Sequence, residues 1–268
     1  MARPTPATPL SADIRLMNAT ALALGGVGAL LVLVVLLLWA AQRPVFALRA
    51  IQVDGELAHN SALTIRANAS PKLAGNFFTL DLAAGRRAFE SVPWVRQAVV
   101  QRVWPNRLRV RLEEHRAAAM WVGAGDADAS SDQLVNSFGE VFEANLGDVE
   151  DDSLPTLGGP DGSSARVLAM HARLQPELAA MQARVERLEL SGRGSWRAEL
   201  DTGVELELGR GSDDEVVART RGFVATLPEL RSRYQQHPLL YADLRHRDGY
   251  AVRLKGVSTA VDAKVQKK

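Results

Sequence analysis

The stretch 95-VRQAVVQRVWPNRLRVRLEE-114 carries the clearest fold signal in this chain. Leu108, Val110 and Leu112 alternate with charged residues, as they do in a strand with one buried face. Residues 95–104 also have the composition of a strand, and the residues between these two segments, Pro-Asn-Arg, supply a turn. We therefore predict a β-hairpin over this stretch.

The residues before the hairpin add one strand and two helices to the pattern. Residues 46–53 have strand composition and end at an Asp-Gly turn pair. Asn60 or Ser61 can cap a first short helix, and Asp81 can cap a second helix over residues 82–89. The predicted order is β-α-α-β-β, which can close one small α+β core.

An uncharged stretch precedes this unit. Residues 16–42 contain no Asp, Glu, Lys or Arg, and residues 21–41 are all apolar or Gly. Twenty-one residues at about 1.5 Å each span about 32 Å, close to the roughly 30 Å hydrocarbon thickness of a bilayer. We predict a transmembrane helix over residues 19–41. It follows a tail over residues 1–18, whose Pro-rich first part is expected to be disordered.

A cleaved signal peptide is the alternative interpretation of this stretch. The apolar region of a signal peptide normally runs about 7–15 residues and ends in a small-x-small site. Here the run is longer, and Trp39 at its end suits the interfacial aromatic belt of a retained anchor. Arg3 and Arg15 before the span balance Arg43 and Arg49 after it, so charge alone does not set the orientation.

The predicted span contains one candidate packing motif. Ala21, Gly25 and Ala29 form a small-xxx-small stripe, which can pack against another transmembrane helix. Such stripes also arise by chance in spans rich in Ala and Gly, so both interpretations stay open.

Composition and motifs argue against several classes of function. A net charge of +1 over 268 residues does not favour nucleic-acid binding, and the absence of Cys excludes disulfides and thiolate sites. No P-loop, G-x-S-x-G elbow or Rossmann fingerprint occurs, and the five His share no metal-ligand spacing. Residues 123–132 resemble a calcium loop but lack its central Gly, and Ser137 stands where the final Glu belongs. We therefore expect that the protein is not an enzyme and that it binds no cofactor, no metal and no small-molecule substrate.

Residues 116–256 predict a second α+β domain. Ser212 and Glu215 have the spacing of a capping box, followed by apolar residues at helical intervals. Residues 167–181 form another helical stripe, which Pro176 is expected to split or kink. The remaining segments are predicted strands over 185–190, 196–200 and 204–208 and a flexible tail over 257–268.

Motifs in both halves, taken in order, resemble one protein family. The span, the β-α-α-β-β order, and SVPWV at 91–95 leading into VWPNRLRVRLEE at 103–114 resemble the POTRA domain of the FtsQ/DivIB family of bacterial cell-division proteins. LVNSFGEVF at 134–142, LPTLGGP at 154–160 and DLRHRDGYAVR at 243–253 resemble that family's later motifs. The family usually has Pro soon after the last Glu of the hairpin, where this chain has His115-Arg116.

The resemblance implies a domain organisation and a function. It implies a POTRA domain over residues 44–115 and a β-rich FtsQ-type domain over 116–256. The implied protein is a bitopic scaffold of the divisome, with a cytoplasmic N-terminal tail and periplasmic C-terminal domains (single-pass type II). It would lie in the inner membrane at the septum, link early and late division proteins, and bind FtsB and FtsL. The alternative is a POTRA-bearing adaptor of envelope transport, although such proteins typically carry several POTRA repeats or a membrane barrel.

The last predicted strand, residues 250–255, is the candidate partner-binding site. If it closes the sheet, its outer backbone groups are free to pair with a strand of another chain. Arg253 and Lys255 could instead protect that edge, because charges discourage pairing, and the residue pattern leaves both interpretations open.

The family resemblance favours binding at this strand. It places the following residues in the segment that holds FtsB, in complex with FtsL: His246, Asp248, Gly249, Tyr250, Val252 and Leu254. Tyr250 and Leu254 are the expected anchors, and Gly249 is expected to adopt a positive φ in a hairpin turn. Residues 193–196 resemble a second contact region.

Overall fold

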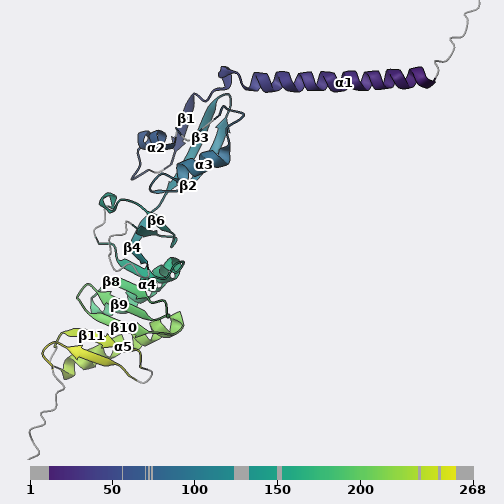
Figure 1. Cartoon of the computed structure of the whole chain (residues 1–268). Helices are drawn as coiled ribbons and strands as arrows, with labels where there is room; N and C mark the ends of the chain where they lie inside the picture. Colours follow the sequence, from purple (N-terminus) through teal and green to yellow (C-terminus); the bar gives the residue numbers. More distant parts are fainter. Residues whose placement is uncertain are drawn as a thin grey trace, which may run out of the picture. The chain divides into compact units, whose positions relative to one another are not determined.

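The structure is a computed structural model that describes residues 12–55, 57–69, 71, 73, 75–123, 133–149, 153–234, 237–246 and 249–257. The chain divides into two compact units, Met1–Glu113 and Glu114–Lys268 (Figure 1). The first unit contains α1 (Ala12–Ala41), the 3-10 turn η1 (Pro44–Phe46), β1 (Ala50–Asp54), α2 (Ala62–Ala69), α3 (Leu82–Glu90), β2 (Val95–Val103) and β3 (Arg107–Glu114). The second contains β4 (Ala117–Gly123), β5 (Gln133–Asn136), β6 (Val141–Glu143), η3 (Leu146–Asp148), β7 (Thr156–Gly159), α4 (Ser164–Leu178), η4 (Ala179–Met181), β8 (Val185–Leu190), β9 (Trp196–Leu200), β10 (Glu205–Gly209), α5 (Asp213–Arg233), β11 (Leu239–Asp243) and β12 (Ala251–Leu254).

The helix α1 begins before the predicted span. Residues 12–15 belong to the stretch that we expected to be disordered, and this expectation is wrong for them because they are helical. Residues 1–11 lie outside the described residues, and the tail over 1–18 stays a prediction. No Gly or Pro occurs between Pro9 and Gly25, so nothing interrupts the helix there. Its apolar part, Leu16–Ala41, has 26 residues and a mean hydropathy of 2.9, enough by length and composition to cross a membrane.

The first unit has the predicted β-α-α-β-β order. Its sheet runs β1-β3-β2, with β1 parallel to β3, and Leu108, Val110 and Leu112 on β3 are all buried. Ile65 of α2 and Phe89 of α3 are fully buried in the same core as β3. The alternation of β3 therefore places the core of this unit between the sheet and its two helices.

Local residue chemistry sets the ends of these elements. The Asp81 carboxylate accepts hydrogen bonds from the backbone N–H groups of Ala83 and Ala84 at 2.8 and 3.2 Å, which confirms it as the cap of α3. The strand predicted from residue 46 begins only at Ala50, which corrects that prediction. Residues 44–46 form a 3-10 turn because Pro44 is pre-set for a first helical position.

The second unit is built on a nine-stranded sheet. Its strand order is β12-β11-β10-β9-β8-β7-β4-β5-β6. The pairs β4–β7, β7–β8 and β10–β11 are parallel. The helix α4 connects β7 to β8, and α5 connects β10 to β11, as parallel neighbours require a crossover connection. The strands β12 and β6 are therefore the two edges of the sheet.

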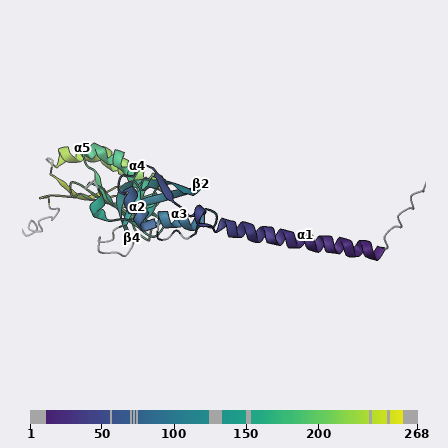
Figure 2. The ribbon, with the colours of Figure 1, turned by 90° about the horizontal axis from the view of Figure 1, so that it is seen from above.

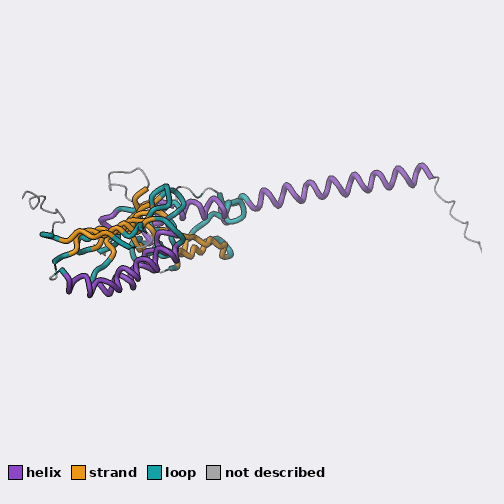
Figure 3. The backbone as a smooth tube through the Cα atoms, turned by 90° about the horizontal axis from the view of Figure 1, so that it is seen from below, coloured by secondary structure: helices purple, strands orange, loops and turns teal. Residues whose placement is uncertain are grey.

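Both long helices cover the same face of this sheet (Figures 2 and 3). Leu174 of α4 and Phe223 of α5 pack in one core with Trp196 and Leu206 of the sheet. The opposite face carries charged residues, such as Arg197, whose guanidinium lies 2.6 Å from a carboxylate oxygen of Glu207. The unit is thus apolar on one side of the sheet and polar on the other.

Two sequence features of the helices are resolved differently. The capping box is confirmed: the Ser212 hydroxyl accepts from the Glu215 N–H at 3.3 Å, and the Glu215 carboxylate accepts from the Ser212 N–H at 2.8 Å. Pro176 does not split α4, which continues to Leu178, so the predicted split is wrong, while the alternative of a kink stays a prediction. Because Pro176 lies in the last turn, its missing N–H removes one bond only where the helix already passes into η4.

Candidate functional site

The strand β12 forms an open edge of the second unit's sheet. It pairs with β11 on one side, in antiparallel register, with Arg253 opposite Tyr241 and Ala251 opposite Asp243. No other strand of the described chain lies on its other side. We call that outer side the β12 edge.

The backbone hydrogen bonds define which groups face outward. The Lys255 N–H donates to the carbonyl of Pro238 at 2.9 Å, so Lys255 faces the β11 side. Hydrogen-bonded and open positions alternate along an antiparallel strand, so Arg253 also faces β11, whereas the N–H and C=O of Val252 face the β12 edge. The Leu244 N–H donates to the carbonyl of Glu207 on β10 at 2.8 Å, so Leu244 faces β10 and its neighbour Asp243 faces β12. This agrees with the assignment, because Asp243 pairs with Ala251.

The side chains of β12 divide between the core and the polar face. Leu254 is buried and only 7% exposed, and Val252 is half-buried against the core that the sheet shares with α4 and α5. Ala251, Arg253 and Lys255 are exposed on the opposite face. A partner strand would therefore meet Val252 through its backbone, and truncating Leu254 would open the core beneath the strand.

Tyr250 is held by α5. Its ring centroid lies 5.0 Å from that of Phe223 in an edge-to-face arrangement, and its hydroxyl lies 2.6 Å from the hydroxyl of Thr226. The Tyr250 side chain is nevertheless 36% exposed. Tyr250 thus anchors the residue directly before β12 to α5, and part of its ring remains exposed for contact with another molecule.

An ion pair orders the chain where it leaves β11. The Arg245 guanidinium donates to both carboxylate oxygens of Asp243, at 2.9 and 2.6 Å, and the Arg245 N–H donates to the same carboxylate at 3.0 Å. Asp243 is 7% exposed. The hydrogen bond from the Arg245 side chain is the main reason that the pKa of Asp243 falls from 3.8 to about 2. The sequence analysis missed this clamp, because Arg245 lies beyond the end of β11 and no strand periodicity relates it to Asp243.

The Asp243 clamp predicts a pH-dependent contribution to stability. A carboxyl group with a lowered folded pKa stabilises the protein above its unfolded pKa, and this stability is lost as the pH falls from about 4 to 2. We expect Asp243→Asn to lower the free energy of unfolding by roughly 1–2 kcal/mol at pH 7 and to make little difference at pH 2. Thermal unfolding of both proteins across this pH range measures the gap, that is, the difference between their free energies of unfolding.

Comparison with the variant isolates Asp243 from other acids. Hydrogen bonds from Arg184 and Arg221, respectively, also lower the pKa values of Asp201 and Glu177, and both titrate equally in the two proteins. A gap that stays constant between pH 7 and pH 2 would contradict the assigned role of the clamp.

The other predicted site residues are placed less decisively. His246 is exposed, and Asp248 lies outside the described residues. Gly249 is exposed, and a Cβ added there would meet no atom within 4 Å, while its positive φ in a hairpin turn stays a prediction. In the second contact region, Trp196 is fully buried and cannot touch a partner, because the alternation of β9 turns it into the core.

The packing motif of α1 remains a prediction. Ala21, Gly25 and Ala29 are exposed, and a Cβ added at Gly25 would meet no atom within 4 Å. Their spacing of four residues places them on one helix face, which leaves room for close approach of a second helix.

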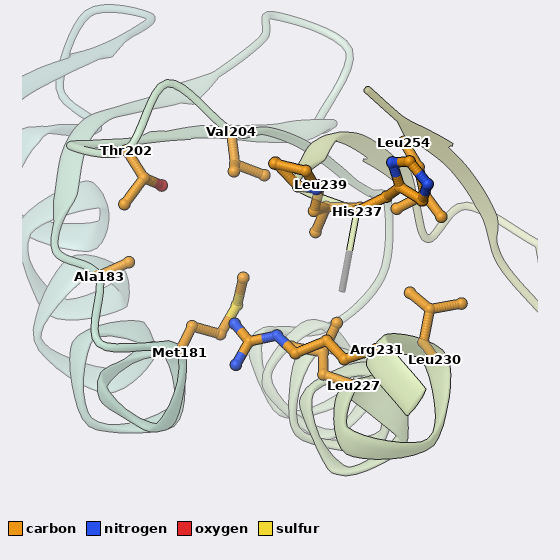
Figure 4. Close-up of a pocket in the computed structure, with 11 residues that line it drawn as sticks. Met181, Ala183, Thr202, Val204, Leu227, Leu230, Arg231, His237, Leu239 and Leu254 are labelled. Carbon is orange, nitrogen blue, oxygen red and sulfur yellow. The ribbon is translucent and has the colours of Figure 1, made fainter. Parts of the chain in front are cut away.

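A pocket of about 360 Å³ lies beneath the ends of β11 and β12 (Figure 4). Leu227 of α5, Leu239 of β11 and Leu254 of β12 contribute apolar walls, and Arg231 and His237 are the ionisable groups that line it. None of its described lining residues is a carboxylate. This pocket thus lacks the acid–base pair expected of a hydrolytic site.

Metal-ligating residues do not gather in the described ranges. No group of three or more His, Cys, Asp or Glu could hold a metal ion there. His59 stacks on Trp94 with ring centroids 3.8 Å apart, and His115 stacks on Phe142 at 4.1 Å. Of the calcium-like loop over residues 123–132, residues 124–132 lie outside the described residues.

Comparisons with known proteins agree with the family predicted from the sequence. Residues 119–245 match the family model "Cell division protein FtsQ/DivIB, C-terminal", and residues 46–115 match "POTRA domain, FtsQ-type". Proteins named Cell division protein FtsQ are similar over most of the chain. The protein of Thiomonas arsenitoxydans is 42% identical over 246 residues, covering 91% of this chain and 89% of the relative.

Two further relatives cover the chain as fully. The FtsQ of Burkholderia pseudomallei is 39% identical over 257 residues, covering 96% of this chain and 99% of its own length. That of Bordetella pertussis is 37% identical over 259 residues, covering 90% and 92%. The match to the C-terminal family model ends at residue 245, so it does not extend over β12.

Proposed function

The chain belongs to the FtsQ/DivIB family of cell division proteins, and we propose that it captures its division partners by strand addition at the β12 edge. Proteins of this family are non-enzymatic division scaffolds, so binding is the activity to be explained. The observation that carries the proposal is the outward-facing backbone of Val252 on a strand with one neighbour. An extended segment of a partner pairs with such groups as a strand of the same sheet.

The number of outward groups limits the affinity of this edge. The N–H and C=O of Val252 and the N–H of Leu254 face outward by the same alternation. At roughly 0.5–1.5 kcal/mol each, three bonds contribute about 1.5–4.5 kcal/mol, which corresponds at best to millimolar affinity. Side-chain contacts, such as those with the exposed part of Tyr250, must supply the rest.

Confinement to a membrane raises the effective concentration of the partners. The helix α1 is consistent with a single-pass anchor, and we propose that it holds the protein in the inner membrane as a type II protein with its C-terminal units in the periplasm. Partners anchored in the same membrane then meet the β12 edge at high local concentration. The high local concentration offsets the weak affinity of a short strand. It also explains why a scaffold without catalytic activity would carry a membrane anchor.

Charge on β12 restricts which strands can pair with it. Arg253 and Lys255 are exposed on the polar face, so an incoming strand with acidic residues facing them is favoured. A second copy of β12 would bring like charges together, which discourages self-association. We propose that FtsB- and FtsL-type division proteins provide the complementary segment, at the septum and together with other divisome components.

Affinity purification of the full chain tests this function. A tagged copy that replaces the native homologue in a bacterium would be recovered from detergent-solubilised inner membranes. We expect small, single-span coiled-coil division proteins of the FtsB and FtsL type to co-purify in near-equal amounts. Recovery of an outer-membrane barrel or transport components in their place would contradict the proposal and support the envelope-transport alternative.

A further inference from the structure

The first unit exposes large apolar side chains at one end. Trp104 is 76% exposed, Phe78 is 50% exposed and Val45 is 62% exposed. They lie respectively in the β2–β3 turn, in the segment before α3 and in η1. We call these three residues the apolar rim. Large apolar side chains that are exposed close to one another mark a surface that meets a membrane or a partner.

Hydrogen bonds hold the three segments of the rim together. The Phe77 N–H donates to the carbonyl of Phe46 at 2.9 Å, and the rings of Phe46 and Phe78 lie 4.9 Å apart. The Arg49 N–H donates to the carbonyl of Asn106 at 3.0 Å, which joins the segment after η1 to the β2–β3 turn.

A side-chain bond closes this arrangement. The Arg102 guanidinium donates to the carbonyl of Leu80 at 2.6 Å, so the strand leading to Trp104 is tied to the segment that follows Phe78. The three segments that carry the rim are therefore held next to one another.

The rim lies next to the end of the apolar helix. Phe46 follows Ala41 by five residues, which span at most about 18 Å. The Asn76 side-chain amide donates to the carbonyl of Ala41 at 2.7 Å, and so occupies one of the carbonyls that a helix leaves open at its C-terminus. At the same end, the Arg43 guanidinium lies 3.4 Å from the ring centroid of Trp39, a pairing suited to a membrane interface.

The three segments that carry the rim contain charged side chains of one sign only. Residues 43–49, 76–80 and 102–107 contain no Asp or Glu and four Arg, namely Arg43, Arg49, Arg102 and Arg107. Apolar side chains surrounded by cations match the boundary between acyl chains and phosphate groups.

We propose that the apolar rim is a phospholipid-binding surface that docks the POTRA domain onto the bilayer in which α1 is anchored. Val45, Phe78 and Trp104 insert about 5–10 Å below the phosphates, and the four arginines bind lipid phosphate groups. The domain then lies on the membrane surface and is not free to swing on the residues between α1 and β1. This inference concerns α1 and the first unit, and it does not depend on binding at the β12 edge.

Spin labels on the full chain test this docking. The chain has no Cys, so a single introduced Cys is a unique labelling site. Ala47→Cys places the label beside the rim while its three side chains stay intact. Gln97→Cys is the matched control, exposed on β2 and seven residues, or about 23 Å along the strand, from Trp104.

The measurement is the collision rate of each label with oxygen and with a water-soluble nickel chelate. The full chain would be reconstituted in vesicles of phosphatidylethanolamine and phosphatidylglycerol, with no other protein present. We expect the Ala47→Cys label to collide more often with oxygen, which concentrates in the bilayer, and the Gln97→Cys label to collide more often with the nickel chelate, which stays in water. Adding Phe78→Ser and Trp104→Ser should move the first label by about 5 Å toward water.

Two outcomes would overturn the proposal. If the two serine substitutions leave the Ala47→Cys label at its original depth while circular dichroism shows a folded domain, the tether alone sets its position. If that label favours nickel in the intact protein, the rim faces water in a membrane of lipid alone. A change to oxygen only after division proteins are added would then assign the rim to a protein partner.

Discussion

Replacing Val252 with Pro is expected to abolish partner capture while leaving the second unit folded. The Val252 N–H faces the β12 edge, so Pro at this position removes a donor to the partner and none to β11. The partner's carbonyl is left unsatisfied at a buried interface, and the Pro ring occupies the space of the incoming strand. Together these effects predict a loss of at least about 100-fold in affinity.

Two further variants make the Val252→Pro result specific. Val252→Ala keeps the N–H and shortens a half-buried side chain, so it is expected to retain the partner. Arg253→Pro removes an N–H that faces Tyr241 on β11, so it is expected to disrupt the β11–β12 pairing and to lower the melting temperature. Co-purification with FtsB- and FtsL-type proteins and thermal unfolding would be measured for all three. Normal partner binding by a folded Val252→Pro protein would exclude strand addition at this edge.

The sequence predicts the first unit better than the second for a physical reason. The strand β3 alternates strictly between apolar and charged residues, and local caps such as Asp81 mark the helix ends. The strand β4, with the sequence AAAMWVG, shows no such alternation, and β7 is only TLGG. Their order in the sheet depends on crossovers through α4 and α5, and a periodicity of two residues carries no information about those pairings.

The candidate site was predictable in position and only partly in its roles. Alternation placed Val252 and Leu254 on one face of the last strand, and this holds in the structure. It could not reveal that Leu254 is buried, or that α5 holds Tyr250 through Phe223 and Thr226. Which side of a strand meets a distant helix is a tertiary property. For the same reason, Leu254→Ala would report on core stability more than on partner contact.

Among Gly→Ala replacements in the second unit, Gly139→Ala is expected to be strongly destabilising. Gly139 has a φ of +82°, and an added Cβ would lie 2.5 Å from the Cα of Ala165 in α4. Its carbonyl accepts a hydrogen bond from the Ser164 hydroxyl at 2.6 Å, so the β5–β6 turn is fixed against the first turn of that helix. Neither backbone can move away without breaking this contact. Strain in φ and overpacking together predict a loss of roughly 2–4 kcal/mol.

The matched control separates these two costs. Gly162 has a similar φ of +75°, but an added Cβ there would meet nothing within 4 Å, so Gly162→Ala should lose only about 1–2 kcal/mol. For a unit of this size, each kcal/mol lowers the melting temperature by roughly 2–4 °C, so the drop for Gly139→Ala should be about twice that for Gly162→Ala. Equal drops would mean that the contact with Ala165 contributes nothing. A larger drop for Gly139→Ala would instead show that the α4 contact requires glycine, so the central Gly of the 134–142 motif is set by packing as well as by turn geometry.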